Sequence, residues 1–357
     1  MAKHSQSKDV KREVKKDLKN EEKNNKKKSK KKKRRRIILL ILLILIIALG
    51  IFIGVRIHRA GGNLLAAILG HDENTRKNLD TIQILILGES TGMSDTIVVA
   101  QYNPKNQTAA LLSIPRDTFV GTSLSNARSS DKINSKFSHG ETIEDTVEAV
   151  NTLTGLNIHY YILVDTEALI KLVDTIGGLE FDVPIDMNYD DATQDLHIHL
   201  SAGYQKLNGA QVEQLVRFRH NNDGSTYSYS TYGGEDFGRM RTQRNVIISL
   251  AQQTLKFKNV TEIFNIIDIL KTYVKTNINL DYIKDYVPYA VEMNMDEIKT
   301  GQLPGTDGPS NGIYFFIPDK EATLELVDEL FNEKLPEEEV DGNNTVDDNS
   351  TENNTVD

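Results

Sequence analysis

The sequence predicts an α/β fold, an α-β-α sandwich in which a mixed central sheet is flanked by helices, preceded by one transmembrane helix. Three observations predict it. Strand-like and helix-like segments alternate between residues 80 and 335, which is typical of a sheet covered by helices. A run of 19 residues without any charge, residues 37–55, precedes them. The first 36 residues are too basic, and the last 22 too acidic, to join a hydrophobic core.

The chain begins with a basic arm, residues 1–36, which holds 18 Lys or Arg and 5 Asp or Glu. A predicted transmembrane signal-anchor, residues 37–57, follows. Its uncharged run is about 28 Å long as a helix, enough to cross a hydrocarbon core. Because Lys and Arg concentrate before it, we expect a single-pass protein of the cell membrane with a cytoplasmic N-terminus and an extracellular remainder. The arm has no interleaved aromatic residues, so we expect topological and lipid-binding roles and no nucleic-acid partner.

After a polar juxtamembrane linker, residues 58–79, the extracellular domain (residues 80–335) begins with strands. The run TIQILILG is continuously apolar, as in a strand buried on both faces. DTIVVAQYN and TAALLSIP flank a Pro-Lys-Asn-Gln turn, which predicts two strands joined as a hairpin. ETIEDTVEAVNTLTG has helical spacing and ends at a glycine. These segments are strands at 81–88, 95–103 and 108–115 and a helix at 141–155.

The rest of the domain is mainly helical. NIHYYILVD and LEFDVP predict strands on either side of the helix TEALIKLVDTIGG, which ends in two glycines. Near the end, IYFFIP predicts a strand and KEATLELVDELFNEK a closing helix. Residues 336–357 hold eight acids and no base, which predicts a disordered acidic tail. Between the strands LEFDVP and IYFFIP, helical spacing predicts helices at 208–218, 238–256, 260–274 and 280–293.

The first predicted strand ends in a G-x-S-x-G motif, Gly88 to Gly92, with Ser90 at its centre. In α/β hydrolases this motif places a nucleophilic serine at a strand–turn–helix junction. Here another strand-like segment follows the turn, and none of the later histidines has a setting that marks it as a base. The sequence therefore disfavours a serine hydrolase.

Carboxylates near this strand end indicate a different chemistry. Glu89 and Asp95, with the Ser90 hydroxyl, lie at one edge of the predicted sheet, the edge where α/β folds place their sites. Carboxylate and hydroxyl oxygens suit a hard cation such as Mg²⁺ or Mn²⁺. The simpler interpretation, in which Asp95 only caps or turns the chain, stays open.

Arginines follow several predicted element ends. Arg116 comes after a strand in SIPRDTFV, and Arg217 and Arg219 lie two residues apart in LVRFRH, where an extended chain places them on one face. The guanidinium group is planar and permanently charged, so it suits phosphate oxygens. Ion pairs with local aspartates such as Asp117 and Asp236 are the alternative.

The segment EDFGRMRTQR adds three more arginines next to Asp236. Arg239 lies close to the start of a predicted helix. Arg241 and Arg244 lie inside that helix, where surface solvation or ion pairing is the simpler role.

Several of these segments, in this order, resemble the motifs of the LytR–CpsA–Psr family. They lie between about Ile82 and Leu250 and are SDTIVVAQYNPKNQTAALLSIPRDTFV, DKINSKFSHG, YYILVDTEALIKLVDTIGGLEFDVP, LVRFRH and DFGRMRTQR. The single N-terminal anchor is also typical of the family. The resemblance implies an extracytoplasmic phosphotransferase of Gram-positive cell wall biogenesis. Such an enzyme moves a glycopolymer, such as wall teichoic acid, from a polyprenyl-pyrophosphate carrier to the C6 hydroxyl of N-acetylmuramic acid in peptidoglycan.

The resemblance also implies the roles of single residues. Asp95 of SDT matches a catalytic, Mg²⁺-associated acid, Lys132 of DKIN matches a basic substrate contact, and Asp236 matches a substrate-site acid near the arginines. Four arginines match those that bind the pyrophosphate and act in catalysis. They are Arg116, Arg217, Arg219 and Arg239.

One position departs from the family pattern. The family usually has Asp two residues after the glycine that ends the first strand, whereas this chain has Ser90, with Glu89 next to it and a shorter loop before Asp95. Either Glu89 replaces that carboxylate as a second metal ligand, or the metal site has one acid fewer. We expect the base that deprotonates the acceptor hydroxyl to be Asp95 or Glu89.

Two other functions stay open at this point. One is a non-catalytic, membrane-tethered regulator or scaffold that binds wall polymer, and the other is a hydrolase that releases the glycan from its polyprenyl pyrophosphate. The apolar segments VIISLAQQ and EIFNIIDIL could line a channel for the prenyl chain or simply pack in the core. The chain has no Cys, which excludes disulfides and thiolate metal sites.

Overall fold

The computed structural model describes residues 31–33, 41–90, 92–137, 142–256 and 260–332. The predicted acidic tail and the basic arm up to residue 30 lie outside these ranges. The chain groups into two compact units: one contains Met1–Asp80 with Pro104–Gln107 and Asp281–Met293, and the other contains the sheet and its helices. The predicted fold class, a mixed sheet flanked by helices and preceded by one apolar helix, is confirmed.

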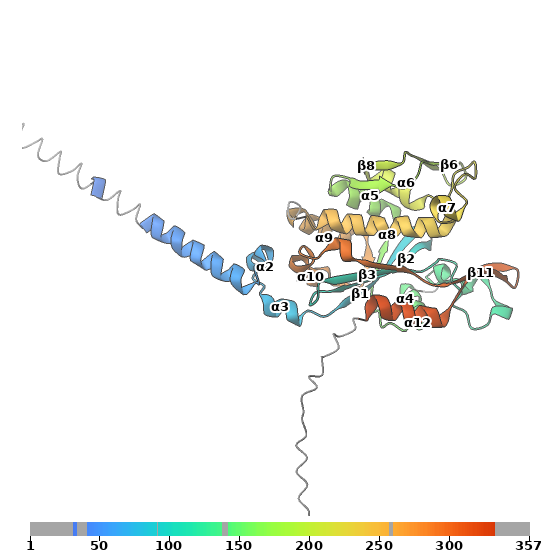
Figure 1. Cartoon of the computed structure of the whole chain (residues 1–357), viewed down its shortest axis with the longest axis horizontal. Helices are drawn as coiled ribbons and strands as arrows, with labels where there is room; N and C mark the ends of the chain where they lie inside the picture. The colour runs from blue at the N-terminus through green and yellow to red at the C-terminus, as the bar shows by residue number, and fades with distance from the viewer. Residues whose placement is uncertain (1–30, 34–40, 91, 138–141, 257–259, 333–357) are drawn as a thin grey trace, which may run out of the picture. The chain divides into compact units, whose positions relative to one another are not determined.

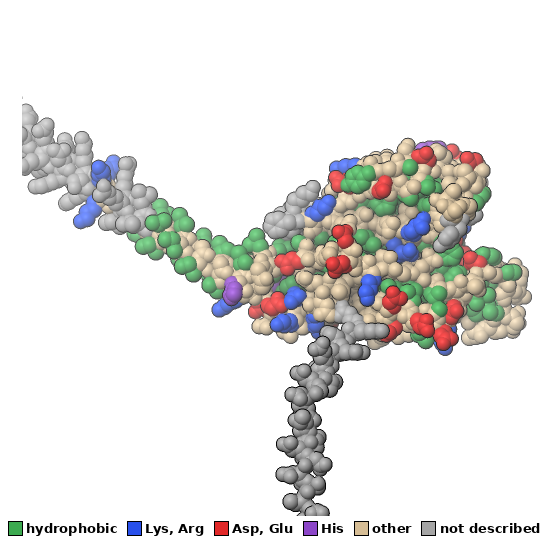
Figure 2. Space-filling model, viewed as in Figure 1, with side chains coloured by type: hydrophobic (Ala, Val, Ile, Leu, Met, Phe, Trp, Pro, Cys, Tyr) green, Lys and Arg blue, Asp and Glu red, His purple; other side chains and the backbone are tan. Residues whose placement is uncertain are grey.

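The first unit contains an apolar helix, Ile41–Arg59, of 19 residues with a mean hydropathy of 2.6. Its large apolar side chains are exposed and appear in green along this helix in Figure 2. By length and composition this helix indicates a single-pass membrane anchor. The predicted polar linker, residues 58–79, contains two short helices, α2 (Leu64–Leu69) and α3 (Glu73–Asn78), each capped by an Asn or Asp side chain.

The second unit is built on a six-stranded sheet with the strand order β10-β3-β2-β1-β4-β9. β1 is antiparallel to β2, with which it forms a hairpin, and parallel to β4. β3 is antiparallel to β2 and parallel to β10. The strands are β1 (Ile82–Ser90), β2 (Met93–Asn103), β3 (Thr108–Ser113), β4 (Tyr160–Val164), β9 (Lys275–Thr276) and β10 (Lys299–Gln302).

Helices cover both faces of the sheet (Figure 1). α4 (Ile143–Thr154) and α12 (Lys320–Phe331) lie on one side. α5 (Thr166–Thr175), α6 (Gly209–Arg217) and α8 (Glu235–Thr254) lie on the other. The alternation of strand and helix signals in the sequence predicted this layering.

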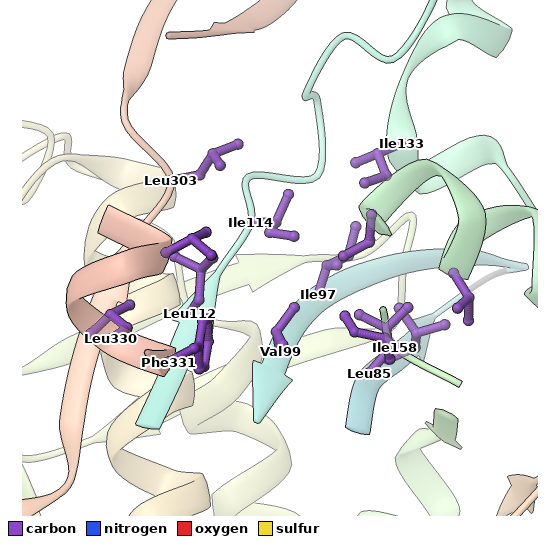
Figure 3. Close-up of a cluster of buried hydrophobic side chains, with 14 of the residues drawn as sticks. Leu85, Ile97, Val99, Leu112, Ile114, Ile133, Ile158, Leu303, Leu330 and Phe331 are labelled. Carbon is purple, nitrogen blue, oxygen red and sulfur yellow. The ribbon is translucent and has the colours of Figure 1, made fainter. Parts of the chain in front are cut away.

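The main hydrophobic core lies between the sheet and the α4–α12 layer (Figure 3). Leu85, Val99 and Leu112, from three neighbouring strands, are fully buried. Alternate residues of a strand face the same side, so each strand contributes several side chains to this core. Leu330 and Phe331 of α12 pack against them. Burial of side chains this large stabilises the fold by about 1.5–3 kcal/mol each.

A second core lies among α5, α6, α8 and two small two-stranded sheets. β5 (Leu179–Val183) pairs with β8 (Gly203–Leu207), and β6 (Met187–Asp191) pairs with β7 (Leu196–Leu200). β6, β7 and β8 were not predicted from the sequence, although LHIHL alternates as a half-buried strand should. Its three apolar residues are buried and its two histidines are exposed.

The predicted helix over residues 280–293 is interrupted. It forms two single turns, α10 (Leu280–Ile283) and α11 (Val287–Ala290). Pro288 lies at the start of α11, where its missing N–H is tolerated, whereas the interior of a longer helix would exclude it. Other elements are α7 (Tyr229–Tyr232), α9 (Val260–Tyr273) and the hairpin strands β11 (Gly305–Ser310) and β12 (Ile313–Pro318).

Candidate functional site

The G-x-S-x-G segment forms the end of a β-hairpin. β1 ends at Ser90 and β2 begins at Met93, so a strand follows the turn, as predicted. Gly88 lies so close to its partner Thr96 that a Cβ atom on Gly88 would stand 2.9 Å from the Thr96 Cβ. The register shifts immediately after Gly88, which redirects Glu89. The motif therefore shapes the edge of the sheet and is not a nucleophile elbow.

Arg116 lies at this edge, in the loop after β3. Its Nη1 atom is 2.5 Å from Oδ1 of Asp95 on β2. Its Nε atom is 3.7 Å from Oδ2 of Asp117 and 4.0 Å from Oδ2 of Asp236. Nε is buried, makes no hydrogen bond with a described residue and faces these two carboxylates.

Asp236 brings two further arginines to the same place. Its Oδ1 atom is 2.9 Å from Nε of Arg219 and 3.1 Å from Nη2 of Arg239. Asp236 lies in the first turn of α8, where the helix dipole favours a negative charge. Arg239 follows one turn later and is only 4% exposed. Three arginines from separate chain segments, Arg116, Arg219 and Arg239, therefore meet around one carboxylate.

The charges of this cluster shift its protonation equilibria. Burial alone would raise the pKa of Asp236, but the positive charges of Arg239, Arg219 and Arg116 outweigh it and lower that pKa. Burial lowers the pKa of Arg239, because desolvation disfavours its charged form. Burial acts in the same direction on Arg116, but the neighbouring carboxylates, Asp236 first, outweigh it and raise its pKa. Asp236 is therefore ionised, and its negative charge neutralises part of the positive charge of the arginines around it.

Lys132 lies next to Asp117, at one side of the arginine cluster. Its Nζ atom is 2.7 Å from Oδ1 of Asp117 and 5.8 Å from the ring centroid of Phe315 on β12. The sequence predicted Lys132 as a substrate contact, and the structure places it next to the arginines through Asp117.

Arg217 and Arg219 reach the site because a helix ends between them. Arg217 is the last residue of α6, and Phe218 is extended, with φ −61° and ψ 132°. Both arginines line the cavity described below, which agrees with the prediction that they lie on one face of the chain. Arg217 also pairs with Glu213 one turn earlier, with 2.7 Å between Nη1 and Oε1.

The arginines line a cavity of about 510 Å³ between the sheet and the α5, α6 and α8 layer. We call one group of its lining residues the mouth, namely Glu89, Asp95, Arg116, Arg217, Arg219, His220 and Arg239. Most of the other lining residues are aliphatic, among them Ile86, Ile162, Val164, Leu169, Leu172, Val246, Ile247 and Leu250. A single chamber thus combines aliphatic side chains with a group of arginines.

The cavity wall uses one of the two predicted apolar segments. Val246, Ile247 and Leu250 of VIISLAQQ line it. None of the described residues of EIFNIIDIL does, and Ile266 and Ile267 are buried elsewhere on α9.

Sequence reasoning missed other residues of this cavity. Tyr189 and Gln194 come from the β6–β7 hairpin, which carried no recognised signal, and Gln243 lies one turn after Arg239 on α8. Gln243 is buried and donates from Nε2 to the carbonyl of Val216 at 3.0 Å, which ties α8 to α6. Only helical spacing from Arg239 could have indicated it.

The expected surface role was wrong for Arg244. Arg244 is 9% exposed, and burial lowers its pKa. It faces inward because α8 is covered on more than one side. Arg241 is exposed, as expected, and donates from Nη2 to the carbonyl of Tyr232 at 2.8 Å.

Three carboxylates line the cavity, and one of them, Asp165, caps α5 by accepting from the Ala168 N–H, which leaves Asp95 and Glu89 as candidates for a metal ion. In the part of the chain that the structure describes, no group of three or more His, Asp or Glu side chains is arranged to hold a metal. A cation here would take the rest of its ligands from substrate phosphate and water, which Mg²⁺ commonly does.

Comparison with known proteins gives consistent results. A family model described as the LytR_cpsA_psr family matches residues 4–332. TagU of Bacillus anthracis, named a polyisoprenyl-teichoic acid–peptidoglycan teichoic acid transferase, is 32% identical over 250 residues, or 67% of this chain and 75% of that protein. An uncharacterized protein of Staphylococcus aureus is 29% identical over 229 residues. This match covers 64% of the present chain but only about half (53%) of the relative. The crystal structure of Bacillus subtilis TagV superposes with a TM-score of 0.56 at 27% identity, over 72% of this chain and 99% of that one.

Proposed function

The chain belongs to the LytR–CpsA–Psr family, and on this basis we propose that it is a membrane-anchored glycopolymer transferase. It moves a glycopolymer of the teichoic-acid class from a polyprenyl-pyrophosphate carrier to peptidoglycan. The alignment with TagU, which covers most of that named transferase, supports this activity. The proposed acceptor is the C6 hydroxyl of N-acetylmuramic acid.

The shape and charge of the cavity carry the proposal. A prenyl chain requires an apolar chamber, and a pyrophosphate requires positive charge with planar donors. Both requirements are met in one cavity, whose lining combines aliphatic side chains with Arg116, Arg219 and Arg239. A scaffold that binds only wall polymer would need neither feature.

The reaction needs positioning and charge neutralisation more than covalent help from the protein. The acceptor oxygen bonds to the glycan-linked phosphorus, the bond from that phosphorus to the bridging oxygen breaks, and prenyl phosphate leaves. The arginines stabilise the charge that develops on the leaving phosphate. The acceptor proton passes to a carboxylate at the mouth, Asp95 or Glu89. The product is a phosphodiester between glycopolymer and peptidoglycan.

Transfer can be measured directly with the full chain. Incubation with a prenyl-pyrophosphate glycan and peptidoglycan should give muramic acid joined to the glycan through one phosphate, identified by mass spectrometry. Free glycan phosphate as the main product would assign hydrolysis instead. Carrier binding without any product would assign the scaffold function.

We propose that Asp95 and Glu89 hold a divalent cation, Mg²⁺ or Mn²⁺, when the carrier is bound. Such an ion would neutralise phosphate charge. We expect EDTA to weaken binding of the carrier lipid and to lower transfer, and added Mg²⁺ to restore both. Glu89→Gln should raise the Mg²⁺ concentration needed for half-maximal binding. A wild-type protein insensitive to EDTA would remove the metal from the site.

The proposed orientation places the N-terminus in the cytoplasm and the second unit outside the cell. The excess of Lys and Arg before the apolar helix supports it. Protease added to intact protoplasts should remove a C-terminal epitope tag and spare an N-terminal one. The opposite pattern would contradict the orientation.

A further inference from the structure

Arg116 separates the cavity from a second group of charged side chains. Its Nη1 atom contacts Asp95, which lines the cavity. Its Nε atom faces Asp117 and Asp236, which are not among the described residues that line the cavity. With Lys132, which pairs with Asp117, these two aspartates form what we call the outer cluster.

The β11–β12 hairpin borders the outer cluster and is fixed to it by backbone hydrogen bonds. Phe316 N–H donates to the Asp117 carbonyl at 2.9 Å, and Phe119 N–H donates to the Phe316 carbonyl at 2.8 Å. The ring of Phe315 lies beneath the ammonium group of Lys132. The hairpin is therefore held in place and forms one wall of this part of the site.

One face of the hairpin carries two polar side chains, Asp307 and Tyr314. Asp307 pairs with Phe316 in the register, and Tyr314 lies two residues before Phe316, so all three share a face. The ring of Phe316 contacts the ring of Phe237, the neighbour of Asp236, with centroids 6.3 Å apart. Tyr314 is 55% exposed.

The electrostatics agree with this placement. Burial raises the pKa of Asp307 and of Tyr314, and the charges of Asp117 and Asp236 raise both further. The two side chains also interact with each other. An exposed aromatic ring beside carboxylates suits a neutral, hydroxyl-rich ligand, because another anion would be repelled.

The direction of the reaction indicates what this ligand is, and this step rests on the proposed function. Attacking and leaving oxygens are roughly in line in phosphoryl transfer. The prenyl phosphate leaves toward the apolar cavity, so the acceptor approaches the phosphorus from the opposite side. The outer cluster contacts Arg116 and does not line the cavity, so it is a candidate for the acceptor side.

We propose that Tyr314 and Asp307 form the subsite for a sugar ring of the acceptor glycan. The Tyr314 ring packs on the apolar face of the sugar. The Asp307 carboxylate accepts hydrogen bonds from its hydroxyls. Neither residue falls within the segments that resemble the family motifs, which end near Leu250.

Transfer kinetics with varied acceptor test the subsite. We expect Tyr314→Ala to raise the KM for peptidoglycan glycan strands about tenfold, and Asp307→Asn to raise it severalfold. The affinity for the prenyl-pyrophosphate carrier should stay unchanged in both. The matched control is Thr306→Ala, on the opposite face of the same hairpin, which should behave as wild type.

Three results would overturn the subsite. These are an unchanged acceptor KM in both variants, an equal loss in Thr306→Ala, and a loss of carrier affinity as large as the rise in KM. If the wild-type protein transfers nothing, the proposed function fails, and binding of a soluble peptidoglycan fragment is measured instead. Binding that Tyr314→Ala weakens would then support the sugar subsite without the reaction, and binding that it leaves intact would overturn it.

A different observation in the first unit carries a second proposal. Leu64, Ile68 and Leu69 of the six-residue helix α2 are large apolar side chains that are 41%, 65% and 37% exposed. Leu64 and Ile68 lie one turn apart on one side, while Leu65 is buried. Exposed apolar side chains this concentrated mark an interaction surface.

The turn that follows the apolar helix fixes α2 near the end of the membrane anchor. Gly62 N–H donates to the Ile57 carbonyl at 2.9 Å, within that turn. Asn63 caps α2 and donates from Nδ2 to the Pro288 carbonyl at 2.7 Å, which holds α2 against α11. We propose that the exposed side of α2 lies in the headgroup region of the bilayer, close to the point where the apolar helix ends at Arg59.

The chain contains no Trp, so one introduced Trp reports its own surroundings. We expect Ile68→Trp in proteoliposomes to emit at shorter wavelength and to be quenched severalfold more by brominated lipids than the control Lys77→Trp, an exposed position on α3. Water-like emission from position 68, or quenching equal to that of the control, would overturn the contact.

Discussion

Replacing Arg116 with alanine is expected to lower kcat/KM for glycan transfer by at least about 100-fold, the effect of removing one preorganised donor from a developing charge. Arg116 contacts carboxylates on both sides of its guanidinium, at Asp95 and at Asp236. Arg219→Ala should have an effect of similar size. Arg116→Lys should restore little, because an ammonium group cannot replace a planar fork with donors on two sides.

The control for these variants is Arg241→Ala. Arg241 lies on α8 two residues after Arg239 and is exposed, and it donates to the Tyr232 carbonyl. Its loss should change the transfer rate by less than about threefold, because a surface contact of this kind contributes little. Wild-type rates in both Arg116→Ala and Arg219→Ala would refute the proposed mechanism.

Asp236→Asn is expected to lower the free energy of unfolding by about 3 kcal/mol, because it leaves Arg239 charged and buried without its partner carboxylate. For a domain of this size that corresponds to a Tm lower by about 6–12 °C. Arg239 has a side chain that is 5% exposed, and its Nη2 atom lies 3.1 Å from Asp236. Thermal unfolding at neutral pH measures the effect. Asp281→Asn, which breaks an exposed pair with Lys284, should cost less than about 1 kcal/mol.

The same variant should change how stability depends on pH. The folded state lowers the pKa of Asp236 below its ordinary value of 3.8. Its contribution is therefore complete above the unfolded value and is lost as the pH falls through the lower folded value. Wild-type protein should lose more stability than Asp236→Asn over that acidic range. Parallel pH profiles, or equal Tm values at neutral pH, would show that Asp236 does not hold the arginines.

The sequence predicted the parts of the fold that local patterns determine. β1 and β2 follow from apolar runs on either side of a turn, and the same turn excluded a nucleophile elbow at Ser90. The break between α10 and α11 was missed because helical spacing in YIKDYVPYAVEM outweighed Pro288. The β6–β7 hairpin was missed because its strands are short and polar on one side, so tertiary packing determines them.

The candidate site was predicted residue by residue, but its arrangement was not. Motif matches indicated Arg116, Arg219 and Arg239, which are far apart in the chain. The resemblance placed Asp236 near these arginines, and the structure shows that its carboxylate faces all three of them. Burial of Arg244 likewise depends on which elements cover α8, and no local pattern encodes that.

The most direct test is a structure of the full chain with a bound prenyl pyrophosphate. We expect the diphosphate to lie between Arg116, Arg219 and Arg239, and the prenyl chain to lie inside the cavity along Ile162 and Leu250. A diphosphate bound away from these arginines, or a prenyl chain lying on the outer surface with the cavity closed, would contradict it.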